Sequence, residues 1–215
     1  MLDACVLTMV RDGEDYIGPC LRVVAPHVKK IRVAVDARSK DKTKTILAKL
    51  QKEFPGKIEF SERFVGRPIV DLVKVRNWLL DFKEPWGFII DSDEYHQDVE
   101  KYSFEGDNSY AFQCWAVWNK THAHKSSSRA IIGRVFRNKG DLEWLGVWGK
   151  EKLCRGTEKV FENPTLMPYR YIHFTHLKKD KWREEMGQER VADGKFLVQM
   201  PPEIIKIINK IHHVL

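Results

Sequence analysis

The chain has 215 residues, of which 43% are hydrophobic, and its 37 Lys and Arg against 30 Asp and Glu give a net charge of +7. This composition supports a folded core and excludes a largely disordered protein. The four cysteines are scattered without a Cys-x-x-Cys pair, which excludes a zinc ribbon and a disulfide framework. The scattered cysteines also favour the reducing cytosol, so we expect a cytoplasmic protein. We expect neither a signal peptide nor a membrane-spanning segment. The positive charge suits an anionic ligand, a nucleic acid or a lipid headgroup surface.

The first 100 residues alternate between apolar strands and amphipathic helices. Strands are predicted at 5–10, 30–35, 57–60 and 88–90, and helices at 16–24, 45–54 and 70–82. Turn sequences such as Asp12-Gly13 and Pro55-Gly56 separate these elements. The resulting β-α-β-α-β-α-β order predicts an α/β fold with a Rossmann-like, mostly parallel sheet flanked by helices.

The second half has aromatic strands and more polar connections. Strands are predicted at 110–119, 130–136 and 171–174, a basic loop at 120–129, and a charged helix at 178–191. Pro201-Pro202 begins a last helix with an apolar stripe, Ile204, Ile208, Ile211 and Leu215. The stripe is expected to pack on the domain, with a homodimer contact or a membrane surface as alternatives. We predict one compact domain over residues 1–215 with two functional halves, 1–100 and 101–215.

The segment Asp91-Ser92-Asp93-Glu94 directly follows the apolar run Phe88-Ile89-Ile90. A strand that ends in three carboxylates delivers them to the edge of the sheet, where ligands of open α/β sheets bind. Crowded carboxylates repel one another unless a cation lies between them. A solvated acidic turn is one alternative. A calcium loop is excluded, because its fifth and sixth positions would be Tyr95 and His96. The segment therefore favours a divalent metal that holds a phosphate.

Four segments in chain order resemble the family 2 glycosyltransferases, which have the GT-A fold. They are Val6 to Glu14, the pattern Asp36-x-x-Ser39-x-Asp41-x-Thr43, the helix pair Arg76-Asn77, and Phe88 to Glu94 with an Asp-x-Asp motif. The resemblance covers residues 4–100. It implies transfer of a sugar, with inversion, from a nucleoside diphosphate sugar to an acceptor hydroxyl, and UDP is the expected nucleotide. Residues 1–100 would bind the donor, and residues 101–215 the acceptor.

The resemblance also implies roles for single residues. The nucleotide-sugar site would comprise Val10, Arg11, Asp36, Arg76, Asp91 and Ser92. Val10 and Arg11 would touch the nucleobase, while Asp36 would accept hydrogen bonds from the base or ribose. Asp91 would face the ribose or a metal-bound water. Asp93 would be the main ligand of Mn²⁺ or Mg²⁺, which neutralises the charge that develops on the leaving diphosphate.

The acceptor side departs from the family pattern. Where the family often has Gly-x-Val-His-Glu, this chain has Gly146-Val147-Trp148-Gly149-Lys150-Glu151. Glu151 is the first candidate for the general base, with Glu143, Asp141 and Glu94 open as alternatives. Tyr171 to His176 resembles a segment that adds a late His to the metal shell in some GT-A enzymes. Residues three apart on a strand face opposite sides, so one His is expected to reach the metal. We select His176, because Lys178, Lys179 and Lys181 follow it.

Two other functional classes stay open at the level of the sequence. A nucleic-acid-binding module could use the basic loop at 120–129 and the tryptophans Trp115, Trp118, Trp144 and Trp148, although packing is the expected role of these tryptophans. A nucleotidyltransferase would also place Asp-x-Asp at a strand end. For a transferase, the net charge admits an anionic polymer such as DNA as acceptor, or a cell-surface glycan precursor.

Overall fold

The structure of the protein is a computed structural model that describes residues 1–63, 70–117, 119–124, 131–146, 151–174 and 197–214. Strands alternate with helices in its first half, in the predicted order. The elements are β1 (Leu2–Val10), α1 (Ile17–Val24), the 3₁₀ helix η1 (Ala25–His27), β2 (Val28–Asp36), α2 (Thr43–Glu53), β3 (Ile58–Arg63), α3 (Val70–Leu79) and β4 (Trp86–Ile89). The predicted boundaries differ by a few residues, because the hydrophobic periodicity fades at the ends of elements.

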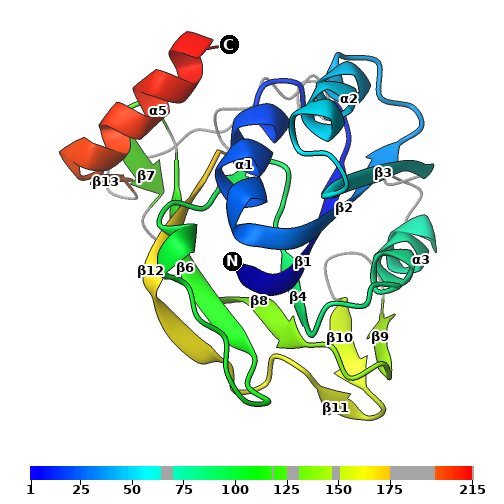
Figure 1. The fold of residues 1–215 in the computed structure, drawn as a ribbon. Helices are drawn as coiled ribbons and strands as arrows, with labels where there is room; N and C mark the ends of the chain where they lie inside the picture. Colours follow the sequence, from blue (N-terminus) through cyan, green and yellow to red (C-terminus); the bar gives the residue numbers. More distant parts are fainter. Residues whose placement is uncertain (64–69, 118, 125–130, 147–150, 175–196, 215) are drawn as a thin grey trace.

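The second half is built mostly of strands. The elements are β5 (Glu94–Tyr95), the 3₁₀ helix η2 (Val99–Lys101), β6 (Tyr110–Ala116), β7 (His122–His124), β8 (Ile132–Arg137), β9 (Leu142–Leu145), β10 (Lys152–Arg155), β11 (Glu158–Lys159), β12 (Thr165–His173), β13 (Leu197–Gln199) and α5 (Pro202–Val214). Figure 1 shows the small β9–β11 sheet below α3, and α5 at the opposite side of the molecule.

An eight-stranded sheet runs through both halves in the order β3-β2-β1-β4-β8-β6-β12-β5. Strands β3, β2, β1 and β4 are parallel. Strand β8 is antiparallel to both of its neighbours, β4 and β6, while β6 and β12 are parallel to each other. The sheet is therefore mostly parallel, as predicted.

Side chains of β1 alternate between the two faces of this sheet. Ala4 and Val6 belong to the core that contains Leu21 of α1 and Leu47 of α2. Their neighbours, Cys5 and Leu7, pack on the other face with Val75 and Leu79 of α3. All of these β1 side chains are buried. The sheet is thus covered on both sides by helices, which is why β1 is a continuous apolar run.

Two expectations for the second half need correction. The segment predicted as a loop at 120–129 contains β7, which pairs with β13 in antiparallel fashion from Leu197↔His124 to Gln199↔His122. Strand β12 begins at Thr165 and is longer than the predicted 171–174. Strand β7 has only three residues, the first half of β12 is largely unburied, and the pairing partners of both lie far away in the sequence, so hydrophobic periodicity does not mark them. The charged helix predicted at 178–191 lies outside the described residues.

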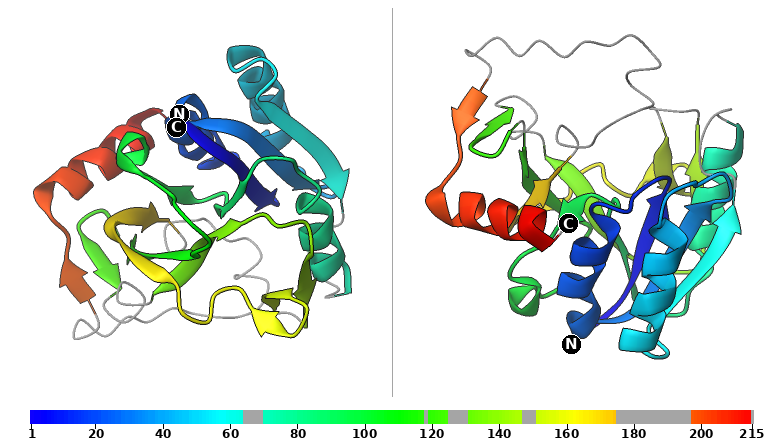
Figure 2. Two further views of the ribbon diagram at one scale, coloured as in Figure 1. Left: turned by 60° about the horizontal axis from the view of Figure 1, so that its bottom comes forward. Right: turned by 90° about the horizontal axis from the view of Figure 1, so that it is seen from above.

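The three isoleucines of the predicted apolar stripe pack on the domain, which confirms the favoured expectation for them, while Leu215 lies outside the described residues. Ile204, Ile208 and Ile211 are buried in one cluster with Tyr16 and Phe174. Figure 2 shows α5 lying alongside the sheet near α1. In the part of the chain that the structure describes, no helix is both long enough and apolar enough to cross a membrane.

Candidate functional site

The carboxyl ends of the parallel strands meet at one edge of the sheet. Strands β2, β1 and β4 point the same way, and β12 does too, because β8 reverses direction between β4 and β6. This edge collects Val10, Asp36, Asp91 and His173, which end or follow these strands. Arg134 reaches the same edge near the start of β8. Ligands of open α/β sheets bind outside this edge, so we treat it as the candidate site.

Two loops at this edge are tied together by reciprocal hydrogen bonds. Ser39 Oγ, Thr43 Oγ1 and Asp41 Oδ2 accept bonds from the backbone amides of residues 12, 13 and 14, at 3.2, 2.8 and 2.8 Å. In return, the carboxylates of Asp12 and Glu14 accept bonds from the amides of residues 40 and 42, at 2.9 and 3.0 Å. We call residues 12–14 and 39–43 the loop latch. It fixes the turn after β1 relative to the turn after β2.

The loop latch explains how the residues predicted to touch the nucleobase are held. Val10 is buried at the end of β1, and a Cβ on Gly13 would lie 2.4 Å from its Cγ2 atom. Only a glycine therefore lets the turn fold back over Val10. Arg11 is exposed beside it, with its Nε 3.7 Å from Asp12 Oδ2. The turn thus presents a rigid backbone and one exposed cation at the edge.

Asp36 ends β2 and is fully buried. Its Oδ1 accepts hydrogen bonds from the amide and Nε of Arg38, both at 2.9 Å, and its Oδ2 accepts one from Arg38 Nη2 at 2.8 Å. Burial by itself would raise the pKa of Asp36, but the bonds from Arg38 outweigh it and lower that pKa below its usual value. Asp36 is therefore an anion at neutral pH, and Arg38 covers its carboxylate.

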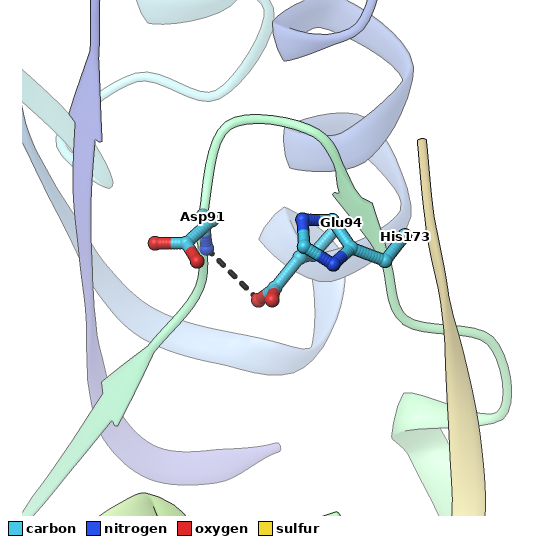
Figure 3. Close-up of side chains that lie close together, drawn as sticks. All are labelled: Asp91, Glu94 and His173. Carbon is cyan, nitrogen blue, oxygen red and sulfur yellow. Dashed lines mark hydrogen bonds between the residues drawn. The ribbon is translucent and has the colours of Figure 1, made fainter. Parts of the chain in front are cut away.

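Asp91, Glu94 and His173 form the group that could hold a metal ion. One ligand atom from each lies within 4.8 Å of the others. Figure 3 shows the three side chains close together, with Asp91 and Glu94 on the segment after β4 and His173 at the end of β12. The Asp91 amide donates a hydrogen bond to Glu94 Oε2 at 2.9 Å. Two carboxylates and an imidazole are a donor set that Mn²⁺ accepts. The residues therefore fit the metal that the sequence predicts.

Asp93 lies next to this group and is buried. Its Oδ2 atom is 3.5 Å from His173 Nε2. Burial would lower the pKa of His173, but Asp93, Cys114 and Glu94 raise it to about 10. The imidazole is thus protonated at neutral pH, and a metal can bind to it only after this proton has left. Among the described residues, the group of three converging ligands does not include Asp93.

Arg134 provides the buried positive charge of the site. Its Nη2 donates to Glu94 Oε1 in a short contact, to Asp91 Oδ2 at 3.2 Å and to Tyr171 Oη at 3.3 Å. Burial by itself would raise the pKa of Glu94, but Arg134, together with His96 and His173, lowers it to about 2. His96 Nε2 is 3.9 Å from Glu94 Oε2, which is too long for a hydrogen bond, so we attribute the low pKa mainly to Arg134.

Arg76, in the last turn of α3, lies close to Asp91, with which it lines one pocket. Its guanidinium lies 4.5 Å from the ring centroid of Trp144. Asn77 fixes the same strand, because its Oδ1 accepts a bond from the Trp144 amide and its Nδ2 donates to the Trp144 carbonyl. A shallow pocket opens between these elements, lined by Leu7, Met9, Arg76, Leu79, Ile89, Asp91 and Trp144. Trp144 is therefore a buried packing residue, as expected, and it forms one wall of this pocket.

The candidate bases differ in their surroundings. Glu151 is half-buried, and it is close enough to Arg76 to oppose the lowering of the pKa of that guanidinium by burial. Asp141 is engaged by Arg155 Nε at 3.0 Å, and Glu143 is exposed on β9. Glu94 is a poor base, because a carboxylate with a pKa of about 2 has little affinity for a proton. These surroundings leave Glu151 as the first candidate.

Sequence reasoning missed three of the residues that the structure brings together. The sequence places Glu94 in the acidic segment that favours a metal but assigns it no ligand role of its own, and it does not single out His173 or Arg134. Arg134 interrupts an otherwise apolar strand, which is a usable signal, because a charge in such a position needs a buried partner. His176, the selected histidine, lies outside the described residues. Ser92 is buried between Asp91 and Asp93, and its predicted contact with the nucleotide stays a prediction.

Comparisons with known proteins concern the fold. No known protein family matches the sequence, and no curated protein matches it. The mannosyltransferase PcManGT from Pyrobaculum calidifontis, solved in complex with GDP-Man and Mn²⁺, aligns over 96% of this chain and 68% of its own, at 11% identity and a TM-score of 0.54. TarS 1–349 from S. aureus aligns over 67% of this chain and 50% of its own, at 17% identity and a TM-score of 0.46. This chain thus spans about half the length of the TarS chain.

The likeness to PcManGT extends over nearly the whole chain and confirms the predicted fold class, an α/β fold of GT-A type. At 11% identity it concerns the fold alone. Membership of family 2 therefore stays a prediction, as do the roles of residues 1–100 and 101–215.

Proposed function

We propose that this protein is a metal-dependent glycosyltransferase that uses a nucleoside diphosphate sugar. The observation that carries the proposal is the group of Asp91, Glu94 and His173 at the carboxyl edge of the sheet. A divalent ion bound there would neutralise charge on a leaving diphosphate. The fold supports the proposal, since PcManGT was solved with GDP-Man and Mn²⁺. Binding of UDP or GDP in the presence of Mn²⁺ or Mg²⁺ is its first consequence.

The proposed metal centre has three candidate ligands and one adjacent carboxylate, Asp93. Asp91, Glu94 and His173 would supply a carboxylate or imidazole atom each. Asp93 would act in the same centre, as a ligand or by orienting His173 through their 3.5 Å contact. His176 stays a predicted ligand. Divalent ions at phosphate sites keep several positions for water and phosphate oxygens, so a small set of protein ligands suffices.

The nucleotide would lie along the edge beside the loop latch. Val10 and Arg11 would contact the base, with the backbone of residues 12–14 fixed by Ser39, Asp41 and Thr43. Asp36 would accept hydrogen bonds from the base or ribose once Arg38 turns aside. Arg134 Nη2 lies 3.2 Å from Asp91 Oδ2, and Arg76 lines the same pocket as Asp91, so both cations would attract the diphosphate.

On the acceptor side, we propose Glu151 as the base of an inverting transfer. It would take the proton of the acceptor hydroxyl while that oxygen attacks the anomeric carbon and the diphosphate leaves. The +7 net charge supports an anionic acceptor, such as a charged polymer or a glycan precursor. A cytoplasmic location and a homodimer remain predictions from the sequence.

The proposal is tested by calorimetry with UDP and GDP, each with and without MnCl₂. We expect one nucleotide to bind only when the metal is present. Asp91→Asn and His173→Gln should each abolish this metal-dependent binding. Asp107→Asn is the matched control, because Asp107 is exposed and its carboxylate lies 2.7 Å from Lys139 Nζ, away from the candidate site. Failure of both nucleotides to bind the wild type with Mn²⁺ or Mg²⁺ would refute the proposal.

The role of Glu151 has a separate test. Glu151→Gln should leave the binding of nucleotide and Mn²⁺ unchanged and lower kcat by about 10²- to 10⁴-fold, the usual contribution of a general base. Glu143→Gln is the control, since Glu143 is exposed on β9. Equal loss of kcat in both variants, or no loss in Glu151→Gln, would remove Glu151 from the mechanism.

A further inference from the structure

Arg134 places a positive charge against the carboxylates of the proposed metal centre. It is buried on β8, and the register Phe88↔Val135 places it beside the end of β4, where Asp91 follows. Its guanidinium contacts both carboxylates that would bind the metal, Asp91 and Glu94. One positive side chain therefore already pairs with two of the three candidate ligands.

The contacts of Arg134 are concentrated on a single nitrogen. Nη2 serves Asp91, Glu94 and the Tyr171 hydroxyl, whereas Nε is buried without a hydrogen-bond partner among the described residues. Arginine–carboxylate pairs are frequently bidentate, with two nitrogens donating in parallel. An unsatisfied buried donor is unfavourable, so this arrangement leaves the guanidinium with bonding capacity that a second ligand could use.

A divalent ion and the Arg134–Glu94 contact compete for the same oxygen atoms. Glu94 Oε1 is taken by Arg134 and Glu94 Oε2 by the Asp91 amide. An ion bound to Asp91, Glu94 and His173 would also stand beside the guanidinium, where like charges repel strongly because the site is buried. Binding of the metal therefore weakens the contact between the guanidinium and Glu94 and favours its release.

We propose that Arg134 is an exchangeable counter-cation: it holds Asp91 and Glu94 in the metal-free protein, and it transfers to the diphosphate of the donor when the metal takes the carboxylates. The inference rests on the proposed function, and it concerns how that site is regulated. Binding of the metal and binding of the nucleotide are then cooperative. The metal releases the guanidinium of Arg134 from the carboxylates, and the diphosphate of the nucleotide accepts it. Arg134 is thus a positioning residue for the donor and a competitor of the metal.

The test measures binding of MnCl₂ alone, and then of UDP or GDP with MnCl₂, by calorimetry. Arg134→Gln removes the charge but keeps a hydrogen-bond donor toward Glu94, and it should bind Mn²⁺ alone at least about tenfold more tightly than the wild type. Arg134→Lys keeps the charge and should retain the weak Mn²⁺ binding of the wild type. In Arg134→Gln, the gain in nucleotide affinity that Mn²⁺ produces should shrink by about 5- to 150-fold.

A matched control is Arg170→Gln, since Arg170 lies over Trp115 and donates to Gln113 on a strand of the same sheet. It should leave Mn²⁺ affinity unchanged. If Arg134→Gln does not fold, NMR of the wild type replaces the comparison of variants. The Nε–H resonance of Arg134 must then shift when Mg²⁺ is added. Equal Mn²⁺ affinity of the wild type and Arg134→Gln, or an unshifted resonance at saturating Mg²⁺, would overturn this inference alone. Absence of Mn²⁺ binding in every variant would overturn the metal centre as well.

Discussion

The loop latch should contribute measurably to the stability of the whole domain, and Asp41 is its best probe. Asp41 Oδ2 accepts a hydrogen bond from the amide of Glu14 at 2.8 Å, and Oδ1 accepts one from the amide of Thr43 at 3.0 Å. Asp41→Ala removes both acceptors, and it leaves one amide in each loop without its partner. The first bond joins the turn after β1 to the turn after β2. The second satisfies the amide of Thr43, the first residue of α2.

The magnitude follows from the number and type of these bonds. A hydrogen bond to a charged group contributes about 1.5–3 kcal/mol, and the lower end applies here because both bonds are only partly buried. We expect Asp41→Ala to lower the free energy of unfolding by about 2–3 kcal/mol. For a chain of this size, 1 kcal/mol corresponds to about 2–4 °C in Tm, so the expected loss is about 4–12 °C.

Thermal unfolding followed by circular dichroism gives the comparison. Asp41→Asn keeps one acceptor oxygen and should lose about half as much Tm as Asp41→Ala. Glu162→Ala is the control, because Glu162 is exposed and its contact with Lys159 is 3.9 Å, so its Tm should stay that of the wild type. Hydrogen exchange at the amide of Glu14 should become faster in Asp41→Ala. Wild-type Tm and unchanged exchange in that variant would show that the latch does not constrain the two turns.

Three further predictions concern the core and the site. Gly87→Ala should destabilise the protein by about 1–3 kcal/mol in urea unfolding, because a Cβ there would lie 2.2 Å from the ring of Phe136; a neutral result would mean that this ring can move aside. Ile208→Ala should cost about 2–5 kcal/mol, since Ile208 is fully buried in the α5 cluster, and a loss below 1 kcal/mol would argue that α5 packs loosely. The folded-state pKa of Asp36 is lowered by Arg38 below its usual 3.8, so the stability from this pair is present above pH 3.8 and is lost as the pH falls through the folded-state value. The difference in unfolding free energy between wild type and Asp36→Asn should therefore shrink below pH 3.8, and a constant difference down to pH 2 would contradict it.

The strand–helix alternation of the first half was predictable because its signals are local. Each of the strands β1, β2 and β4 is an apolar run that ends at a turn or a carboxylate, and a parallel sheet brings those ends to one edge whatever the details of packing. For the same reason, Asp36 and Asp91 could be placed at the site from the sequence. Strand β7 and the first half of β12 could not be predicted, because they are held mainly by pairing with strands far away in the sequence rather than by burial.

The sequence by itself determined an α/β fold with acidic residues at the carboxyl edge of a mostly parallel sheet. Only the tertiary structure decided which side chains meet there. Arg134 and Glu94 are 40 residues apart, and His173 comes from a strand that joins the sheet beyond β8 and β6. Hydrophobic periodicity specifies which face of a strand is buried, but it does not specify the neighbouring strand. The antiparallel insertion of β8 is what carries a buried arginine to the carboxylates, and that pairing is a property of the folded sheet.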